Sequence, residues 1–236
     1  MFQKYIMNTI LIVLGVLLII ILYVSFFVFT GSQSLTAKVD LGTQQAAITA
    51  DKIGNPGSVR YSFETWIYVY QFEAGGKYLF SRGSTDTTGN GHKKNIGLKL
   101  GTSSPELILE YKTAVLGTNG YESLTVSNNF PIQTWTQVIV SIDNNYVDVY
   151  MNGKLVKSIQ KTLEAPSPNS PIEYGLNKAY LAKFVRNTYP VDPQTAWNSY
   201  TAGNGMSSSM SSMLGNFGAT IVLNKDAAEY SKLKLF

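Results

Sequence analysis

The sequence predicts an all-β, antiparallel sandwich that follows a single N-terminal transmembrane helix. Three stretches carry this prediction. Residues 10–29 form an uncharged apolar run, residues 59–70 alternate between two faces, and Asn152-Gly153 separates two β-patterned runs. Alternation is typical of a half-buried strand, and Asn-Gly favours the type I′ turn of a hairpin. Residues 32–236 are long enough for one β domain of ordinary size.

The apolar run has the length of a membrane span. Twenty residues of helix extend roughly 30 Å, the thickness of the hydrocarbon core of a bilayer. A cleaved signal has a shorter apolar region followed by paired small residues, and the segment after Phe29 lacks that pattern. We therefore expect an uncleaved, single-pass anchor in a lipid bilayer, with the anchor residues Ile10, Leu14, Leu17, Ile21, Phe26 and Phe29.

Flanking charge predicts the orientation of this anchor. Lys4 precedes the apolar run, and the first basic residue after it is Lys38. Positive charge favours the cytoplasmic side. The N-terminus is expected there, with the C-terminal domain on the other side of the membrane.

Composition excludes two classes of site. The net charge is +4 and only 14% of residues are charged, so the chain lacks the basic stripe that nucleic acid requires. Cysteine is absent and His92 is the single histidine, which leaves zinc without a ligand set. We expect no nucleic-acid partner and no cofactor.

The rest of the chain reads as strands joined by turns. Residues 32–56 are predicted to hold a stalk and a first strand, and residues 164–171 an extended, proline-rich crossing. Asp192-Pro193 begins a short helix, because Asp caps helices and Pro suits their first position. Residues 203–236 are predicted to be a flexible linker and a C-terminal β tail. Strands are expected at 59–70, 77–82, 96–100, 107–111, 124–126, 136–142, 146–151, 154–159 and 179–185.

Several of these strands resemble one known domain family. YSFETWI at 61–67, YLFSRG at 78–83, WTQVIVS at 135–141 and VYMNGKLV at 149–156 are similar to successive strands of laminin-G-like domains of the concanavalin A-like lectin/glucanase superfamily. The resemblance covers residues 57–202. It implies a jelly-roll-like sandwich of two antiparallel sheets with roughly twelve to fourteen strands. The anchor expected at residues 1–31 precedes this domain.

The whole arrangement resembles a viral class of protein. An N-terminal anchor, a cysteine-free laminin-G-like domain and a short β tail are similar to membrane-associated minor capsid proteins of nucleo-cytoplasmic large DNA viruses. This resemblance implies a structural protein that links an internal virion membrane to the capsid shell, with capsid or membrane proteins as partners. The alternative is a glycan-binding adhesin on a virion or cell surface.

A glycan hydrolase is the third and least favoured interpretation. Glucan hydrolases of this superfamily carry paired carboxylates on one strand, because two carboxyl groups must flank the scissile bond. Glu64 and Glu110 lie on separate predicted strands, and neither has a carboxylate two residues away. We therefore predict no catalytic residues and no enzymatic activity.

Two sets of residues remain as binding candidates. The aromatic residues Trp66, Tyr68 and Tyr70 share one face of their strand and could stack on sugars or pack against a neighbouring protein; alternatively they face the second sheet of the sandwich. Weak calcium candidates are Asp86, Asp143 and Asn145. Asp and Asn are also common in turns for their geometry alone, which we take as the preferred explanation.

Overall fold

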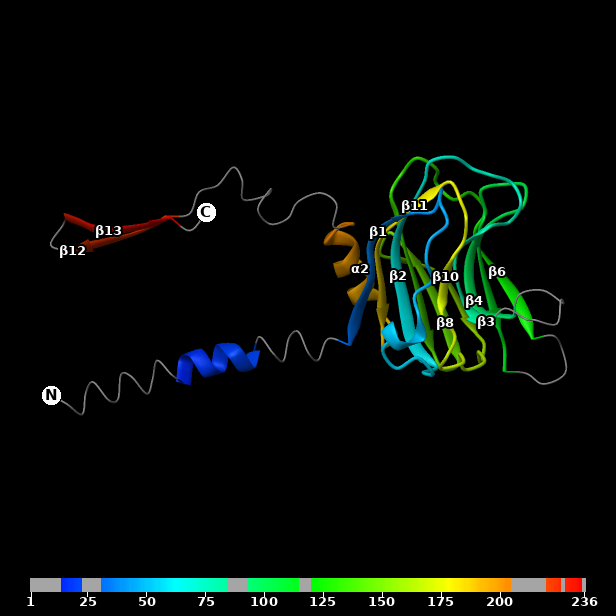
Figure 1. Cartoon of the computed structure of the whole chain (residues 1–236), viewed down its shortest axis with the longest axis horizontal. Helices are drawn as coiled ribbons and strands as arrows, with labels where there is room; N and C mark the ends of the chain where they lie inside the picture. Colours follow the sequence, from blue (N-terminus) through cyan, green and yellow to red (C-terminus); the bar gives the residue numbers. More distant parts are fainter. Residues whose placement is uncertain are drawn as a thin grey trace.

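The protein is a sandwich of two antiparallel sheets, seen in a computed structural model (Figure 1). The structure describes residues 14–22, 31–84, 93–114, 120–204, 220–225 and 228–234. The six-stranded sheet has the order β1 (Ser32–Asp40), β11 (Ala179–Asn187), β2 (Arg60–Val69), β7 (Thr136–Asp143), β8 (Tyr146–Met151) and β9 (Lys154–Gln160). The five-stranded sheet has the order β10 (Ile172–Tyr174), β3 (Tyr78–Ser84), β4 (Lys93–Leu100), β5 (Leu107–Lys112) and β6 (Tyr121–Ser127). The predicted all-β sandwich is confirmed, with eleven strands in its described part.

The core lies between the two sheets. Along β2, Tyr61, Phe63 and Ile67 are each at most 1% exposed, as the alternation predicts. The ring of Phe63 lies 5.3 Å from that of Phe80 on the opposite sheet, and Phe80 lies 4.8 Å from Phe184. These aromatic contacts join the inner faces into one cluster. Because apolar burial is the main favourable term in folding, the cluster explains how the domain holds together without a disulfide.

The predicted hairpin at Asn152-Gly153 is present between β8 and β9. The φ angles are +48° at Asn152 and +74° at Gly153, and both are positive as a type I′ turn requires. The Asn152 carboxamide oxygen also accepts a hydrogen bond of 3.0 Å from the Gln137 backbone N–H. This contact fixes the turn against the start of β7.

The segment predicted to hold a stalk and a first strand does contain a strand, β1, but that strand is part of the sandwich. β1 pairs with β11 from Ser32↔Asn187 to Asp40↔Tyr180, and Leu41, directly after it, is fully buried. The domain therefore begins at residue 32 and not at residue 57. The sequence pattern of β1 is weak because most of its residues are exposed or only partly buried, and Val39 alone in this strand is buried.

One short strand of the sandwich, β10, is missing from the sequence prediction. β10 has three residues and follows the proline-rich crossing, where it pairs with β3 at the edge of the five-stranded sheet. Ile172 in β10 also forms a bridge with Ile48. Such a short strand has too few residues for an alternating pattern to be recognised.

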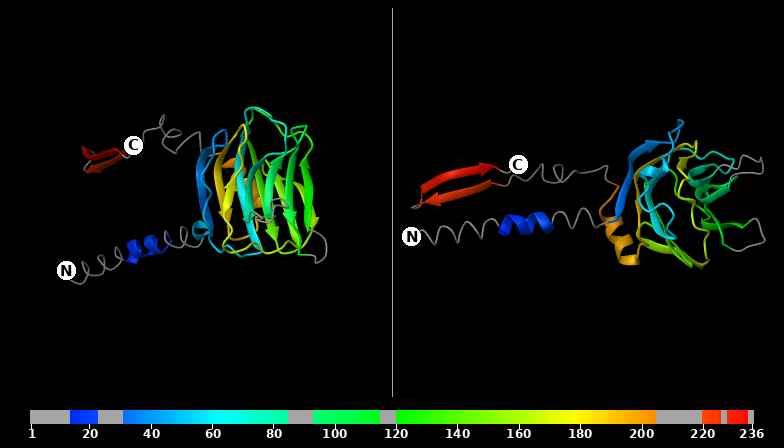
Figure 2. Two further views of the ribbon diagram at one scale, coloured as in Figure 1. Left: turned by 45° about the vertical axis from the view of Figure 1, so that its right-hand side comes forward. Right: turned by 60° about the horizontal axis from the view of Figure 1, so that its bottom comes forward.

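The helix predicted at Asp192-Pro193 is α2 (Pro193–Thr201). The Asp192 side chain accepts hydrogen bonds from the backbone N–H groups of Gln194 and Thr195, at 2.9 and 3.0 Å. Figure 2 shows α2 on the outer side of the six-stranded sheet. A single-turn helix η1 (Ala50–Lys52) lies between β1 and β2.

The two ends of the chain are described only in part. Residues 14–22 are helical, and Leu14, Leu17 and Ile21 are each more than half exposed there. Ile10, Phe26 and Phe29 fall outside the described residues. Within the described ranges, no helix is long and apolar enough to cross a membrane. Near the C-terminus, β12 (Thr220–Lys225) and β13 (Ala228–Lys234) pair with each other in an antiparallel hairpin.

Candidate functional site

The outer face of the six-stranded sheet is partly covered by α2. Trp66 projects from β2 on this face, and its ring stacks on Tyr200 of α2 with centroids 5.7 Å apart. Trp66 is only 7% exposed. This corrects the expectation for Trp66: it lies opposite the core, but a helix covers it rather than a second sheet or solvent, so its ring cannot bind a ligand.

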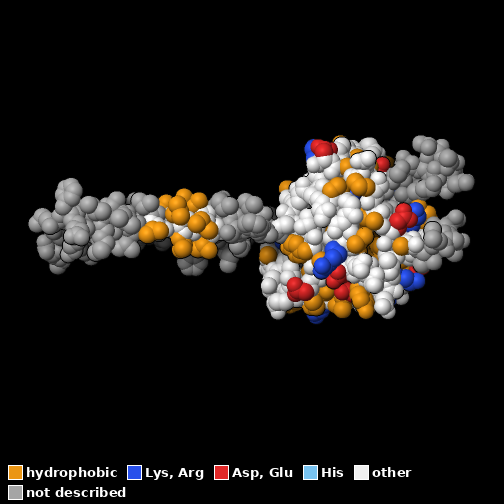
Figure 3. Space-filling view, turned by 90° about the horizontal axis from the view of Figure 1, so that it is seen from below, with side chains coloured by type: hydrophobic (Ala, Val, Ile, Leu, Met, Phe, Trp, Pro, Cys, Tyr) orange, Lys and Arg blue, Asp and Glu red, His pale blue; other side chains and the backbone are white. Residues whose placement is uncertain are grey.

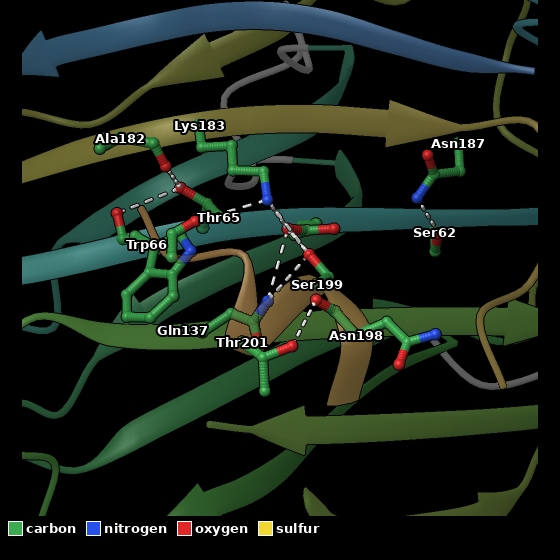
Figure 4. A network of polar contacts seen from close by, with 12 residues as sticks. Ser62, Thr65, Trp66, Gln137, Ala182, Lys183, Asn187, Asn198, Ser199 and Thr201 are labelled. Atoms are coloured by element: carbon green, nitrogen blue, oxygen red, sulfur yellow. Dashed lines mark hydrogen bonds and ion pairs between the residues drawn. The ribbon is translucent and has the colours of Figure 1, made fainter. Parts of the chain in front are cut away.

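A buried polar network holds α2 on the sheet (Figure 4). Glu64 of β2 is 6% exposed, accepts a short hydrogen bond from the Ser199 hydroxyl, and lies 3.4 Å from the Lys183 ammonium. The Gln137 amide nitrogen lies 3.2 Å from Ser199 Oγ. Because a buried carboxylate is costly unless it is paired, this network ties the position of the helix to three strands, β2, β7 and β11.

Beyond the end of α2, the same face carries half-exposed rings. We call Tyr68, Tyr70, Trp135, Tyr180 and Lys38 the distal aromatic cluster. Tyr68 lies 5.3 Å from Trp135, Tyr70 lies 5.1 Å from Tyr180, and the Lys38 ammonium lies 4.9 Å from the Tyr180 ring. The structure thus leaves two of the three predicted aromatics, Tyr68 and Tyr70, accessible.

Two members of this cluster could not be recognised from the sequence. Trp135 and Tyr180 belong to other segments of the chain and join Tyr68 and Tyr70 only through strand pairing, such as Tyr180↔Tyr68 between β11 and β2. The available signal was an aromatic residue on the outer face of a neighbouring strand. That signal can be used only once the strand order is known.

A separate pocket lies on the outer face of the five-stranded sheet. It has a volume of about 210 Å³ and is lined by Tyr78, Lys94, Glu110, Tyr121, Glu122 and Ser123. The Tyr78 ring packs against Gly97, where a Cβ atom would be 2.5 Å from Cε1 of the ring. Its hydroxyl donates a short hydrogen bond to Glu110, and Glu110 is ion-paired with Lys99.

Charges in and around this pocket are matched. Lys94 pairs with Glu173, Lys99 with Glu110, and Lys161 with Glu122. The hydrogen bond from Lys161 lowers the pKa of the Glu122 carboxyl. Burial, together with the hydrogen bond to Glu110, raises the pKa of the Tyr78 hydroxyl, which therefore stays protonated. The pocket offers rings, hydroxyl groups and paired charges, a combination suited to a neutral polar ligand.

The calcium candidates are engaged in other contacts. Asp143 forms an ion pair of 2.8 Å with Arg60, and the Asn145 side-chain oxygen accepts a hydrogen bond of 2.9 Å from Thr162. Asp86 lies outside the described residues. No group of three or more His, Cys, Asp or Glu side chains that could hold a metal occurs in the part of the chain that the structure describes.

The end of the sandwich at which β1 begins carries mixed side chains. Figure 3 shows Lys and Arg beside Asp and Glu on this face, with hydrophobic side chains between them. The Arg60–Asp143 pair joins the ends of β2 and β7.

Comparisons with known proteins point to the same architecture. A profile described as the concanavalin A-like lectin/glucanases superfamily matches residues 41–184. A comparison with curated protein sequences gave no match.

Three solved structures illustrate the similarity. The receptor-binding domain of botulinum neurotoxin type G is 14% identical with a TM-score of 0.46, over 62% of this chain and 38% of that one. Domain 4 of an extracellular arabinanase from Geobacillus stearothermophilus is 18% identical with a TM-score of 0.46, over 64% and 69%. A Trypanosoma rangeli sialidase is 13% identical with a TM-score of 0.49, over 62% and 24%. This chain therefore spans well under half of the toxin and sialidase chains, and these scores do not bear on what it binds.

Proposed function

We propose that this chain, which belongs to the concanavalin A-like lectin/glucanase superfamily, is a non-enzymatic, membrane-anchored structural protein whose sandwich packs on other proteins. In its most specific form, the proposal is a minor capsid protein that links a viral internal membrane to the capsid shell. The viral part rests on the resemblance of the sequence arrangement. The observation that carries the structural part is the course of β1.

β1 runs from the end of the domain nearest the proposed anchor to the end that carries the distal aromatic cluster. Ser32 pairs with Asn187 at one end of the strand, and Asp40 pairs with Tyr180 at the other. Eight steps of about 3.3 Å place the two ends roughly 26 Å apart. The apolar run 10–29 ends shortly before Ser32. An anchor there holds the cluster at the end of the sandwich that points away from the bilayer.

The cluster has the character of a protein-binding surface. Its four rings are half-buried by one another, and Lys38 adds a cation above Tyr180. Aromatic side chains are enriched in protein interfaces, because they bury a large area and still offer a polar atom. Ile132 and Leu176 are 46% and 51% exposed in the loops that precede β7 and β11, at the same end of the sandwich.

Site-specific photo-crosslinking tests this surface. A crosslinking amino acid at Tyr180 in the full chain should capture a discrete coat protein in assembled particles. The control position is Tyr146, which is 51% exposed at the opposite end of the sandwich, beside Asp143. Equal capture from both positions, or capture from neither, would contradict the proposal.

Membrane flotation and protease protection test the anchor. The full chain should float with vesicles, and deletion of residues 1–31 should release it. External protease should reach only one end of the chain in sealed vesicles. Either the C-terminal domain is digested while a tag at the N-terminus is protected, or the tag is digested while the domain is protected. A deletion variant that still floats contradicts the anchor; accessibility of both ends from one side contradicts a single pass.

The non-enzymatic part of the proposal is supported by the carboxylates of the pocket. Glycoside hydrolysis needs one carboxyl group with a raised pKa to act as acid. The pKa of Glu122 is instead lowered by Lys161, and Glu110 is held by Lys99 and Tyr78. Glu122 is therefore poorly suited to act as the acid, and the Glu110 carboxylate is already engaged in an ion pair and a hydrogen bond. Release of reducing sugar from a soluble glycan, lost in Glu110→Gln, would contradict this conclusion.

Glycan binding is a second candidate function, and the pocket at Tyr78 favours it. An aromatic ring beside carboxylate and ammonium groups can stack on a sugar and bond its hydroxyls. Because Lys94 and Lys99 each face a carboxylate, we expect neutral sugars rather than acidic ones. On a glycan array, the full chain should bind neutral glycans and Tyr78→Ala should no longer bind them. Trp66→Ala is the control, because Trp66 is buried on the other sheet, and this variant should still bind the same glycans. Silence of the wild-type chain contradicts this candidate and leaves the structural proposal standing.

A further inference from the structure

Two arginines are buried inside the sandwich at one end of the core. Arg82 projects inward from β3 and Arg186 from β11, so each sheet contributes one, and both are 0% exposed. The Arg186 guanidinium lies 5.1 Å from the ring of Tyr61, which is itself 1% exposed. Arginine keeps its proton at any physiological pH. Two positive charges are therefore held among aromatic rings.

Both arginines donate hydrogen bonds to backbone carbonyls. Arg186 donates to the carbonyls of Gly54 and Asn55, and Arg82 donates to that of Pro56 at 2.6 Å. Arg82 makes longer contacts of 3.4 Å to the carbonyls of Ser167 and Ser170. Among the described residues neither arginine forms an ion pair with a carboxylate. Carbonyl dipoles satisfy hydrogen bonds, but they leave the net charge uncompensated.

Donors remain in this group after the carbonyls are counted. Nη1 of Arg82, Nε of Arg186 and the hydroxyl of Tyr61 are buried without a hydrogen-bond partner in the described structure. Burial lowers the pKa of Arg186 to about 10, and the positive charge of Arg82 adds to this shift. A buried polar group without a partner is costly, and an uncompensated buried charge costs more. Three such donors from two sheets in one small region call for a common acceptor.

We propose that Arg82, Arg186 and Tyr61 form a binding site for a small inorganic anion, with chloride as the fitting case. Each of the three groups can donate a hydrogen bond, and the two guanidinium charges favour an anion over water. The enclosure of all three side chains selects a small ion over an organic acid. The ion also connects the sheets, because it accepts from β3, β11 and β2 at the same point.

The site would make the stability of the fold depend on the anion. An ion that binds only the folded state raises the unfolding midpoint as its concentration increases. The midpoint rises steeply at first and then more slowly. The full chain, in detergent micelles, is unfolded by heat at constant ionic strength while sodium gluconate is replaced by sodium chloride. We expect a rise of roughly 5–10 °C at saturation, and a similar rise with bromide.

Two matched variants separate the site from general salt effects. Tyr61→Phe removes one donor and keeps the ring, so it should weaken the chloride dependence. Tyr150→Phe is the control, because that buried hydroxyl bonds to the Val191 carbonyl instead; its chloride dependence should match the wild type. Equal midpoints in chloride and gluconate for the wild-type chain overturn the proposal, as does a chloride dependence that Tyr61→Phe leaves unchanged.

One further variant tests whether the chain supplies its own counterion. Asp86 follows β3 four residues after Arg82 and lies outside the described residues. If the Asp86 carboxylate compensates the charge of the arginines, the unfolding midpoint of the wild type should not depend on chloride, and that of Asp86→Asn should. This result would overturn the proposal. If the site holds a free anion, Asp86→Asn responds as the wild type does. Crystals of the full chain soaked in bromide should then show anomalous density between the two guanidinium groups.

Discussion

Gly153 offers a measurable link between the β8–β9 hairpin and α2. Its φ of +74° is left-handed, and a Cβ atom there would lie 3.0 Å from Trp197 Cε3 and 3.0 Å from Tyr200 Cβ. Gly153→Ala therefore introduces two costs. The backbone conformation costs an L-residue about 1–2 kcal/mol, and the crowding against the helix adds about 1–3 kcal/mol, as overpacking usually does.

Gly203 supplies the matched control. Its φ is +75°, and a Cβ atom there meets nothing within 4 Å. Gly203→Ala should therefore cost only the backbone term, about 1–2 kcal/mol. Thermal unfolding of both variants is followed by circular dichroism. Gly153→Ala should be less stable than Gly203→Ala by at least about 1 kcal/mol, which lowers its unfolding midpoint by about 2–4 °C. Equal midpoints would refute the packing of α2 on the turn.

Three further predictions concern single positions. Asp192→Ala should destabilise the domain by about 1 kcal/mol and Asp192→Asn by much less, because Asn also caps a helix; thermal unfolding measures both. The hydrogen bond from the Thr195 hydroxyl lowers the pKa of Asp192, so the contribution of this carboxylate is present above its unfolded pKa and is lost as pH falls through the folded one. In a series of thermal unfolding experiments from pH 7 to pH 2, the unfolding midpoint of the wild type should therefore approach that of Asp192→Asn. A difference between the two midpoints that stays constant with pH would contradict the cap. Gly97→Ala should displace the Tyr78 ring and abolish glycan binding at that pocket while the circular dichroism spectrum stays native; unchanged binding would place the ligand elsewhere. Gly175→Ala should prevent native folding, because its Cβ would lie 2.0 Å from the Tyr78 carbonyl oxygen, and a soluble variant with a wild-type midpoint would show that this contact is wrong.

Local chemistry made part of the fold predictable. The alternation of β2, the Asn152-Gly153 turn and the Asp192-Pro193 helix start each depend on residues that are close in sequence, and each is present. The sequence predicts a first strand within 32–56 but places it outside the sandwich, and it does not predict β10, because β1 and a three-residue strand have little pattern of their own. Their place is decided by pairing with β11 and β3.

The candidate sites were harder to predict than the fold, for a related reason. Tyr78, Glu110 and Tyr121 lie on three strands, so the pocket exists only after β3, β4, β5 and β6 have paired. The burial of Arg82 and Arg186 is similarly invisible in the sequence, where arginine normally indicates surface. Pairing between distant segments, rather than any local motif, brings these groups together.

The outer face of β2 shows how one helix decides which residues are available for binding. Glu64, Trp66 and Tyr68 project from the same side of this strand, yet α2 covers the first two and stops short of the third. Glu64 binds Ser199 and Trp66 stacks on Tyr200, so the last turns of the helix are fixed on the sheet by one polar and one aromatic contact. The accessible aromatic surface therefore begins where the contacts of α2 end. A change that loosens this helix, such as Ser199→Ala, should expose Trp66 and extend the distal aromatic cluster along β2, and the red shift of Trp66 fluorescence relative to a Trp66→Phe background measures that exposure.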